Sequence, residues 1–257
     1  MAQSSPLRVL ILGGTTEASL LARLLLDKPG VSPVLSLAGR TRNPVLPPIP
    51  HRIGGFGGVA GLVRYLTEEG VELLVDATHP FAARITPNAA EAARLTGVPL
   101  LRLERPGWVP GPGDDWRMVP DMRAAARALG AAPRRIFLTI GRQDLIPFRD
   151  EAPQHEYLVR SVDPPEASFL PARTSILTAR GPFDVAAERA LLMDARIDML
   201  VTKNSGGSDA KLIAARACVL PVIMVDRPSV LNGARTETAE AALAWILDHG
   251  TLTARGA

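Results

Sequence analysis

Three short stretches of the chain carry side chains that could take part in chemistry, and each directly follows an apolar run typical of a buried strand. They are Gly13-Gly14-Thr15-Thr16-Glu17, Asp76-Ala77-Thr78-His79-Pro80-Phe81 and Lys203-Asn204-Ser205-Gly206-Gly207. In open α/β sheets, ligands bind outside the carboxyl ends of the strands, so all three stretches lie where a site is expected. Their glycines, hydroxyls, imidazole and ammonium suit the binding of an anion and the transfer of a proton.

The first stretch is a glycine turn between a predicted strand and a predicted helix. The strand covers 8–12, and apolar residues then recur at helical spacing over 18–26. Such a turn presents backbone N–H groups and the positive end of the helix dipole, which favour a phosphate. The dinucleotide fingerprint G-x-G-x-x-G is incomplete, because Thr15 and Ala18 stand where two of its glycines belong. The turn alone is therefore compatible with a phosphate site or with a plain connection.

Two arginines follow the next predicted strand and bear on the choice of cofactor. That strand covers 34–37, and Arg40 and Arg42 come shortly after it with no acidic residue beside them. In a Rossmann unit an acid at this position selects NAD, whereas an arginine accommodates the 2′-phosphate of NADP. One charge-assisted contact contributes about 1.5–3 kcal/mol, which is roughly tenfold to a hundredfold in affinity. Arg40 therefore favours NADPH, although solvated loop charges would give the same pattern.

His79 and Lys203 are the candidate catalytic residues. His79 follows the predicted strand over 71–75; it could donate a proton, bond a nicotinamide or a carboxylate, or only cap the next helix. Lysine is rare in the chain, yet Lys203 and Lys211 stand close together around a Gly-rich turn. A compact ammonium beside amide and hydroxyl side chains suits an anionic group. A solvent-exposed lysine on an ordinary turn is the alternative.

The chain contains an internal repeat. The segments 98–106 and 220–228 match in pattern without a gap, and each follows an alanine-rich helix that itself follows a strand and a polar loop. This repeat predicts an α/β fold: two Rossmann-like domains with mainly parallel sheets and a ligand cleft between them. We place the NADPH-binding domain at 1–118 and the second, substrate-binding domain at 119–257. The Gly- and Pro-rich segment 107–120 is the predicted linker.

Periodicity predicts the remaining elements of both halves. Strands are expected over 51–53, 98–103, 135–140, 157–160, 175–178, 198–201 and 221–225. Helices are expected over 59–69, 85–95, 121–129, 183–194, 210–217 and 237–247. Asp121 and Thr236 are the expected N-caps of two of these helices.

Composition narrows the class of protein. The 257 residues are 47% hydrophobic with a net charge of +3, and no run approaches the roughly 18 apolar residues of a membrane span. No secretion signal is visible, and the single Cys218 excludes an internal disulfide, so we expect a cytoplasmic protein. The spacing of histidine and cysteine offers no metal site. Scattered basic residues and few aromatics favour a small anionic ligand over a nucleic acid, and no membrane partner is expected. We also expect a monomer.

The three stretches, together with Gly141-Arg142, resemble the precorrin-6A reductase family of cobalamin biosynthesis over nearly the whole chain. The resemblance implies an enzyme that uses NADPH to reduce the macrocycle of precorrin-6A to precorrin-6B, or the cobalt-containing analogue. It implies that a first group of residues holds NADPH, with the last three near the nicotinamide: Gly13, Gly14, Thr15, Thr16, Glu17, Arg40, Thr78, Pro80 and Phe81.

A second group would bind the acetate and propionate groups of the tetrapyrrole: Arg84, Arg142, Lys203, Asn204, Ser205, Gly206, Gly207 and Lys211. The nicotinamide would deliver a hydride, and the protein mainly orients the reactants. The proton that follows the hydride would come from His79, Lys203 or water.

Two other functions compete with this one. The chain could be a non-enzymatic two-domain protein that binds a small anionic ligand, or another NADP-dependent oxidoreductase. The Y-x-x-x-K pair of short-chain enzymes is missing, because Tyr65 is followed by Glu69 and Tyr157 by Ser161. That absence disfavours the second alternative.

Overall fold

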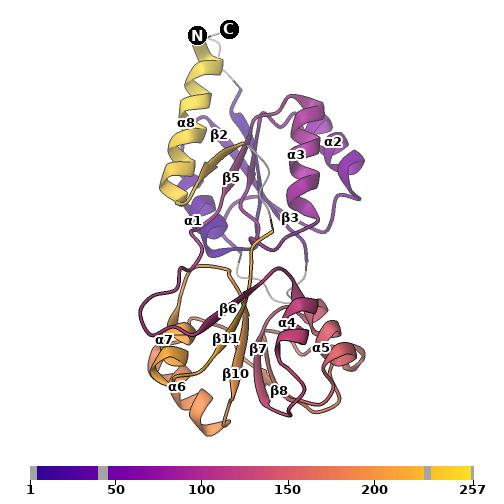
Figure 1. Cartoon of the computed structure of the whole chain (residues 1–257). Coiled ribbons are helices and arrows are strands. Elements are labelled where there is room, and N and C mark those ends of the chain that lie inside the picture. Colours follow the sequence, from indigo (N-terminus) through magenta and orange to yellow (C-terminus); the bar gives the residue numbers. More distant parts are fainter. Residues whose placement is uncertain (1–4, 40–45, 229–232, 256–257) are drawn as a thin grey trace. The chain divides into compact units, whose positions relative to one another are not determined.

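The structure is a computed structural model that describes residues 5–39, 46–228 and 233–255. The chain folds into two units, one of residues 1–106 with 229–257 and one of residues 107–228 (Figure 1). Each unit is a parallel six-stranded sheet with helices, so the predicted fold class is confirmed. No helix within these described ranges is long and apolar enough to cross a membrane.

The first unit is a doubly wound sheet with the strand order β12-β5-β4-β1-β2-β3. Its strands are β1 (Leu7–Leu12), β2 (Val31–Leu37), β3 (His51–Ile53), β4 (Leu73–Asp76), β5 (Leu100–Leu103) and β12 (Ala234–Thr236). Its helices are α1 (Thr16–Leu25), α2 (Val59–Glu68), α3 (Ile85–Thr96) and α8 (Ala239–Arg255). α1 packs beside α8, and α2 beside α3.

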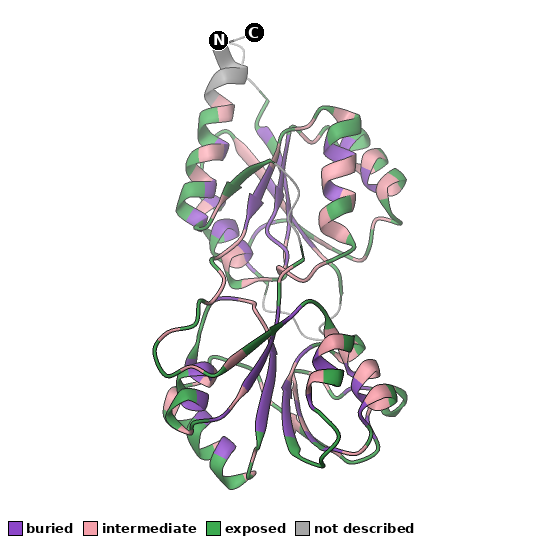
Figure 2. Ribbon diagram, viewed as in Figure 1, coloured by how far each residue is buried: buried purple, intermediate pink, exposed green. Residues whose placement is uncertain are grey.

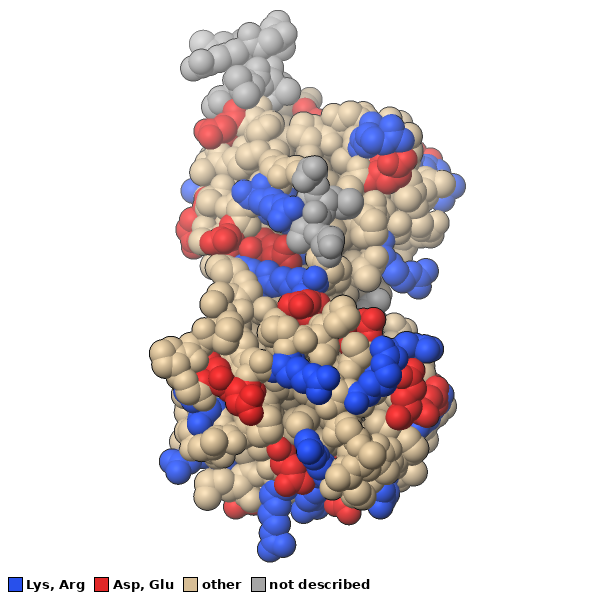
Figure 3. Space-filling view, viewed as in Figure 1, with Lys and Arg blue, Asp and Glu red and all other residues tan. Residues whose placement is uncertain are grey.

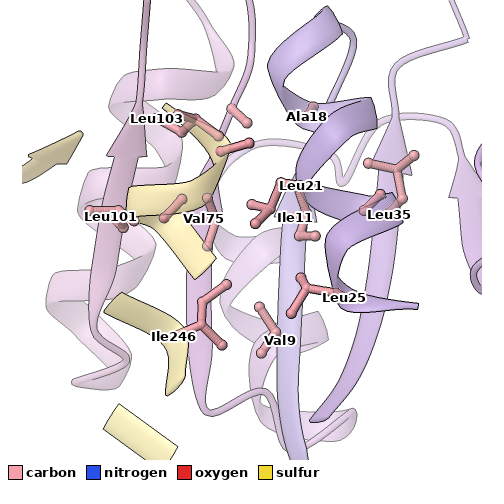
Figure 4. Packing of buried hydrophobic residues seen from close by; sticks show 14 of the residues in the cluster. Val9, Ile11, Ala18, Leu21, Leu25, Leu35, Val75, Leu101, Leu103 and Ile246 are labelled. Atoms are coloured by element: carbon pink, nitrogen blue, oxygen red, sulfur yellow. The ribbon is translucent and has the colours of Figure 1, made fainter. Parts of the chain in front are cut away.

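Alternate residues of β1 face opposite layers of the first unit, as the period of a strand requires. Val9 and Ile11 are buried with Leu21 of α1 and Ile246 of α8 (Figure 4). Leu10 and Leu12 are buried with side chains of α2 and α3 instead. The inner strands β1 and β4 are buried on both faces (Figure 2), which explains why they are continuous apolar runs in the sequence, whereas the edge strands β3 and β12 are largely exposed.

The second unit repeats this arrangement with the strand order β6-β11-β10-β7-β8-β9. Its strands are β6 (Trp116–Val119), β7 (Arg135–Thr139), β8 (Glu156–Ser161), β9 (Thr174–Thr178), β10 (Met199–Lys203) and β11 (Val222–Val225). Its helices are α4 (Met122–Ala128), η1 (Arg142–Leu145), α5 (Ile146–Glu151), η2 (Ala167–Phe169), α6 (Val185–Asp194) and α7 (Ala210–Ala217). The order of elements around β7 and β10 matches that around β1 and β4, as the internal repeat predicts.

The two sheets exchange their edge strands. β6 follows β5 in the chain but pairs with β11 of the second sheet. β12 follows β11 but pairs with β5 of the first sheet, and Ala234 lies beside Leu101. Each sheet is therefore completed by a strand that the other half of the sequence supplies.

This exchange corrects the predicted domain boundaries of 1–118 and 119–257. The segment 229–257 belongs to the first unit, because β12 extends its sheet and α8 packs against α1. The second unit begins at Gly107, and the predicted linker 107–120 contains β6. A short edge strand inside a Gly- and Pro-rich run carries too few periodic positions to be recognised from sequence.

Most predicted helices and strands are present, with shifted ends. The predicted N-cap Asp121 is confirmed, since its Oδ1 accepts a 2.7 Å hydrogen bond from the N–H of Ala124. The predicted N-cap Thr236 is wrong, because that residue ends β12. Thr238 takes the role instead, and its Oγ1 accepts a 3.1 Å hydrogen bond from the N–H of Ala241.

Candidate functional site

The glycine turn of the first unit lies between β1 and α1, and the local structure favours glycine at both positions. A Cβ on Gly13 would lie 2.6 Å from Cδ1 of Leu35 in the neighbouring strand β2. Gly14 has a φ of 120°, which L side chains rarely adopt. Thr15 is the N-cap of α1, and its Oγ1 accepts a 3.1 Å hydrogen bond from the N–H of Ala18. The start of a helix leaves further N–H groups without intrahelical partners, which is the setting for an anion.

The turn is joined to the loop that follows β4. The hydroxyl of Thr15 donates a 2.8 Å hydrogen bond to the carbonyl oxygen of Ala77. The N–H of Ala77 in turn donates to the carbonyl oxygen of Leu12 over 2.9 Å. The strand order reverses between β1 and β4, because the chain runs outward to β3 on one side and to β5 on the other. The two loops thus meet at the switch point where doubly wound folds bind ligands.

Glu17 lies in the first turn of α1 and forms an ion pair with Arg105. The carboxylate and the guanidinium approach to 3.1 Å, and both side chains are about one-fifth exposed, at 21% and 20%. The pair joins the beginning of α1 to the chain just after β5. The charge of Glu17 is thereby offset at the helix end where an anionic ligand is expected.

Thr78 is buried, and its side chain is held inside the first unit. Its N–H and hydroxyl donate to the same carboxylate oxygen, Oδ1 of Asp76, over 3.1 and 2.7 Å. Nη1 of Arg102 lies 2.8 Å from this oxygen and donates to Oγ1 of Thr78 over 3.1 Å. The structure thus places the predicted Thr78 in the loop but directs its hydroxyl toward the sheet.

His79 is the imidazole of this loop. Its Nδ1 accepts a 3.2 Å hydrogen bond from the N–H of Phe81, so Nδ1 is unprotonated and the ring proton resides on Nε2. The rings of His79 and Phe81 are 5.9 Å apart. His79 does not cap α3, because Arg84 occupies the N-cap position of that helix. The bond from Phe81 gives His79 a structural role within its own loop, and its role toward a ligand or a proton stays a prediction.

Lys203 stands at the corresponding switch point of the second unit, between β7 and β10. Its Nζ lies 2.5 Å from Oδ2 of Asp144. The same carboxylate oxygen accepts a 3.1 Å hydrogen bond from the N–H of Gly141. The predicted residues Arg142 and Lys203 are therefore brought to one edge of this sheet, and Asp144 links the two segments.

Three other predicted residues of this edge, Asn204, Gly207 and Lys211, contact the segment around Trp108. The side chain of Asn204 accepts a 2.7 Å bond from the N–H of Trp108 and donates a 3.0 Å bond to its carbonyl oxygen. Nε1 of the indole donates to the carbonyl oxygen of Gly207 over 3.0 Å. Nζ of Lys211 lies 4.7 Å from the centre of the indole ring, a cation–π contact. The amide of Asn204 is thus occupied by the backbone.

Comparison with known proteins identifies the family. A family model described as CbiJ: Precorrin-6x reductase CbiJ/CobK matches residues 8–247. The chain belongs to this family of reductases.

Two relatives of the reductase show how far the similarity extends. Precorrin-6A reductase of Rhodobacter capsulatus is 53% identical over 252 residues, which cover 97% of this chain and 99% of the relative. Cobalt-precorrin-6A reductase of Salmonella typhimurium is 27% identical, with 96% and 98% covered. A solved structure of CobK precorrin-6A reductase is 52% identical, covers 95% of this chain and 97% of that chain, and superposes with a TM-score of 0.89.

Some predicted site residues of the reductase are not among the contacts described at the two sheet edges. Arg40 and Arg42 lie outside the described residues. Arg84 is exposed at the start of α3. On the face drawn in Figure 3, Lys and Arg are interspersed with Asp and Glu in both units. The described residues contain no group of three His, Cys, Asp or Glu side chains that could hold a metal ion.

Sequence reasoning assigned no role to four residues of the reductase that shape the two edges: Asp144, Trp108, Arg102 and Asp76. Asp144 had a recognisable signal, since an acid three residues after Gly141 reaches back to its N–H as in a helix start. Trp108 and Arg102 had none, because each meets its partner through a contact between distant parts of the chain.

Proposed function

We propose that this reductase uses NADPH to reduce precorrin-6A to precorrin-6B in cobalamin biosynthesis, in the cytoplasm. The reaction consumes precorrin-6A, NADPH and one proton and yields precorrin-6B and NADP⁺. The observation that carries the proposal is the hydrogen bond between Thr15 and Ala77, because it joins the glycine turn, suited to a phosphate, to the loop that carries His79. The identity to precorrin-6A reductases, 45–53%, is higher than that to cobalt-precorrin-6A reductases, 27–32%, which favours the substrate without cobalt.

The first unit is the proposed site of the cofactor. Its pyrophosphate would lie against Gly13, Gly14, Thr15 and Thr16, where the N–H groups of the turn and the dipole of α1 favour negative charge. The adenosine then extends over the end of β2, where Arg40 would contact the 2′-phosphate. The nicotinamide half extends the other way, over β4, toward Thr78, Pro80 and Phe81.

The second unit is the proposed site of the tetrapyrrole. Arg142, Lys203 and Lys211 supply positive charge at one edge of its sheet, and the substrate carries several carboxylates. Ser205, Gly206 and Gly207 form the turn between Lys203 and Lys211, and Arg84 of the first unit adds another cation. Hydride transfer requires the two ligands to meet, so we expect them to do so in a cleft between the units.

The chain itself supplies orientation, charge and a proton. The nicotinamide supplies the hydride when it is bound. His79 is one candidate for the proton donor; it would donate as the imidazolium, whose Nδ1 is protonated and no longer accepts the bond from Phe81. Lys203, whose side-chain nitrogen is paired with Asp144, is the second candidate.

The test combines substrate turnover with cofactor choice. Precorrin-6A should oxidise NADPH in the presence of the protein; binding of both without oxidation would favour a non-enzymatic binding protein. Arg40→Ala should weaken NADPH binding about tenfold to a hundredfold and leave NADH nearly unaffected. Arg94→Ala, which removes an exposed ion pair with Glu91 on α3, is the control. Equal losses for NADPH and NADH would remove Arg40 from the 2′-phosphate site.

A further inference from the structure

A pair of charged side chains is buried beneath the loop that carries His79. Asp76 ends β4 and lies beside Arg102 of β5 in the register of the sheet. Because Val75 and Leu101 face α1 and α8, strand alternation directs Asp76 and Arg102 to the opposite face, toward α3. Their side chains are only 1% and 8% exposed.

Asp76 and Arg102 anchor the loop after β4 through Thr78. Oδ1 of Asp76 accepts both the N–H and the hydroxyl of Thr78, over 3.1 and 2.7 Å. Nη1 of Arg102 donates to the hydroxyl of Thr78 over 3.1 Å and to the carbonyl oxygen of Asp76 over 3.4 Å. The next three residues are His79, Pro80 and Phe81, so the position of the candidate proton donor depends on this anchor.

The buried ion pair of Asp76 and Arg102 is not explained by stability alone. Burying charges is costly, and apolar side chains of similar volume often stabilise a protein as well or better. Within the described chain, Oδ2 of Asp76 and Nε of Arg102 are buried without a hydrogen-bond partner. Arg102 also lies 3.5 Å from the carboxylate of Glu104. The cluster is therefore better explained by the loop that it positions than by a contribution to the stability of the fold.

We propose that Asp76 and Arg102 are positioning residues for hydride transfer, which they support by fixing Thr78 and thereby the 79–81 loop against the nicotinamide. The inference rests on the proposed function of the first unit. Neither residue contacts the reactants in this scheme. Their effect falls on the geometry of the nicotinamide half of the cofactor, while the adenosine half over β2 is left alone.

The test uses Asp76→Ala, which removes the acceptor of both Thr78 bonds while Glu104 still balances the charge of Arg102. Asp76→Asn keeps an acceptor oxygen and serves as the conservative variant. Arg102→Lys keeps the charge but not the fork that reaches two partners. Glu91→Ala, an exposed change on α3, is the matched control.

Three readouts separate positioning from general loss of structure. In Asp76→Ala and Arg102→Lys we expect the single-turnover rate of hydride transfer to fall about tenfold to a hundredfold. The deuterium isotope effect with NADPH labelled at the transferred position should rise. Affinity for 2′,5′-ADP, which carries only the adenosine half, should stay within about twofold, and Asp76→Asn should recover most of the rate.

Two results would overturn the inference. One is a rate of hydride transfer in Asp76→Ala and Arg102→Lys equal to that of the unmodified protein. The other is a loss of 2′,5′-ADP affinity as large as the loss of rate. If Asp76→Ala does not fold, Arg102→Lys decides by the same readouts. Failure of the proposed function would look different, because the unmodified protein would then fail to bind 2′,5′-ADP or to oxidise NADPH with precorrin-6A.

Discussion

The hydroxyl of Thr15 makes two hydrogen bonds at once: it donates to the carbonyl oxygen of Ala77 over 2.8 Å and accepts from the N–H of Ala18 over 3.1 Å. One side chain thus caps α1 and ties the glycine turn to the loop after β4. These two segments are separated by about sixty residues of sequence, and the sheet alone brings their strands together.

Thr15→Val should therefore weaken NADPH binding and lower stability. Valine keeps the branched shape but removes the cap, which costs about 1 kcal/mol and lowers the melting temperature by roughly 2–4 °C for a chain of this size. Calorimetric titration with NADPH and thermal unfolding measure the two effects. Thr15→Ser keeps the hydroxyl and should behave nearly as the unmodified protein. Unchanged NADPH affinity in Thr15→Val would contradict a pyrophosphate site at this turn.

Lys203→Ala should impair use of the tetrapyrrole without affecting the cofactor. Loss of one charge-assisted contact with a carboxylate, about 1.5–3 kcal/mol, corresponds to a tenfold to hundredfold fall in kcat/KM for precorrin-6A. Steady-state kinetics with each reactant varied in turn separate the effect on precorrin-6A from the effect on NADPH. Lys28→Ala removes an exposed lysine of the first unit and is the matched control. Normal kinetics for Lys203→Ala would make Lys203 an ordinary surface residue.

The fold could be predicted from sequence where the signal is local. Gly13 and Gly14 mark the turn, and the repeated Arg-Pro endings at Pro106 and Pro228 indicate two similar halves. The exchanged edge strands could not be assigned to their sheets. β12 is three residues long, and its place beside β5 depends on a pairing across more than a hundred residues.

The same distinction holds for the candidate sites. Lys203 and His79 stand out because a rare or ionisable side chain follows an apolar strand. Arg102, by contrast, looks like an outward-facing residue of an ordinary strand, and its burial beside Asp76 appears only once the strands are paired. Asn204 resembles a ligand-binding amide, yet its polar atoms bond the backbone of Trp108.

His155 should make the second unit sensitive to acid. The side chain is fully buried, and burial lowers the pKa of His155 below its ordinary value. The folded protein therefore resists protonation while the unfolded chain binds a proton near its usual pKa of about 6.5. Stability is retained above that pH and declines as the pH falls below it.

Urea unfolding at a series of pH values tests this expectation for His155. Replacement by a side chain that does not titrate, His155→Gln, should flatten the loss of stability between about pH 6.5 and pH 5. His51→Gln changes an exposed histidine and should leave the profile unaltered. An identical slope in His155→Gln and the unmodified protein would show that other groups govern the acid response.

Ile246→Ala should destabilise the first unit, although the residue lies near the carboxyl end of the chain. Ile246 is fully buried against Val9 and Leu21 in the layer formed by α1 and α8 (Figure 4). Removal of such a side chain leaves a cavity and costs about 2–5 kcal/mol. When urea unfolding is monitored by NADPH binding, the variant should lose its cofactor site at a lower urea concentration than the unmodified protein. Leu247→Ala, a neighbouring change at a partly exposed position (37%), should have little effect. If cofactor binding survived while only the second unit loosened, α8 would belong to that unit, as the boundary at 118 and 119 implies.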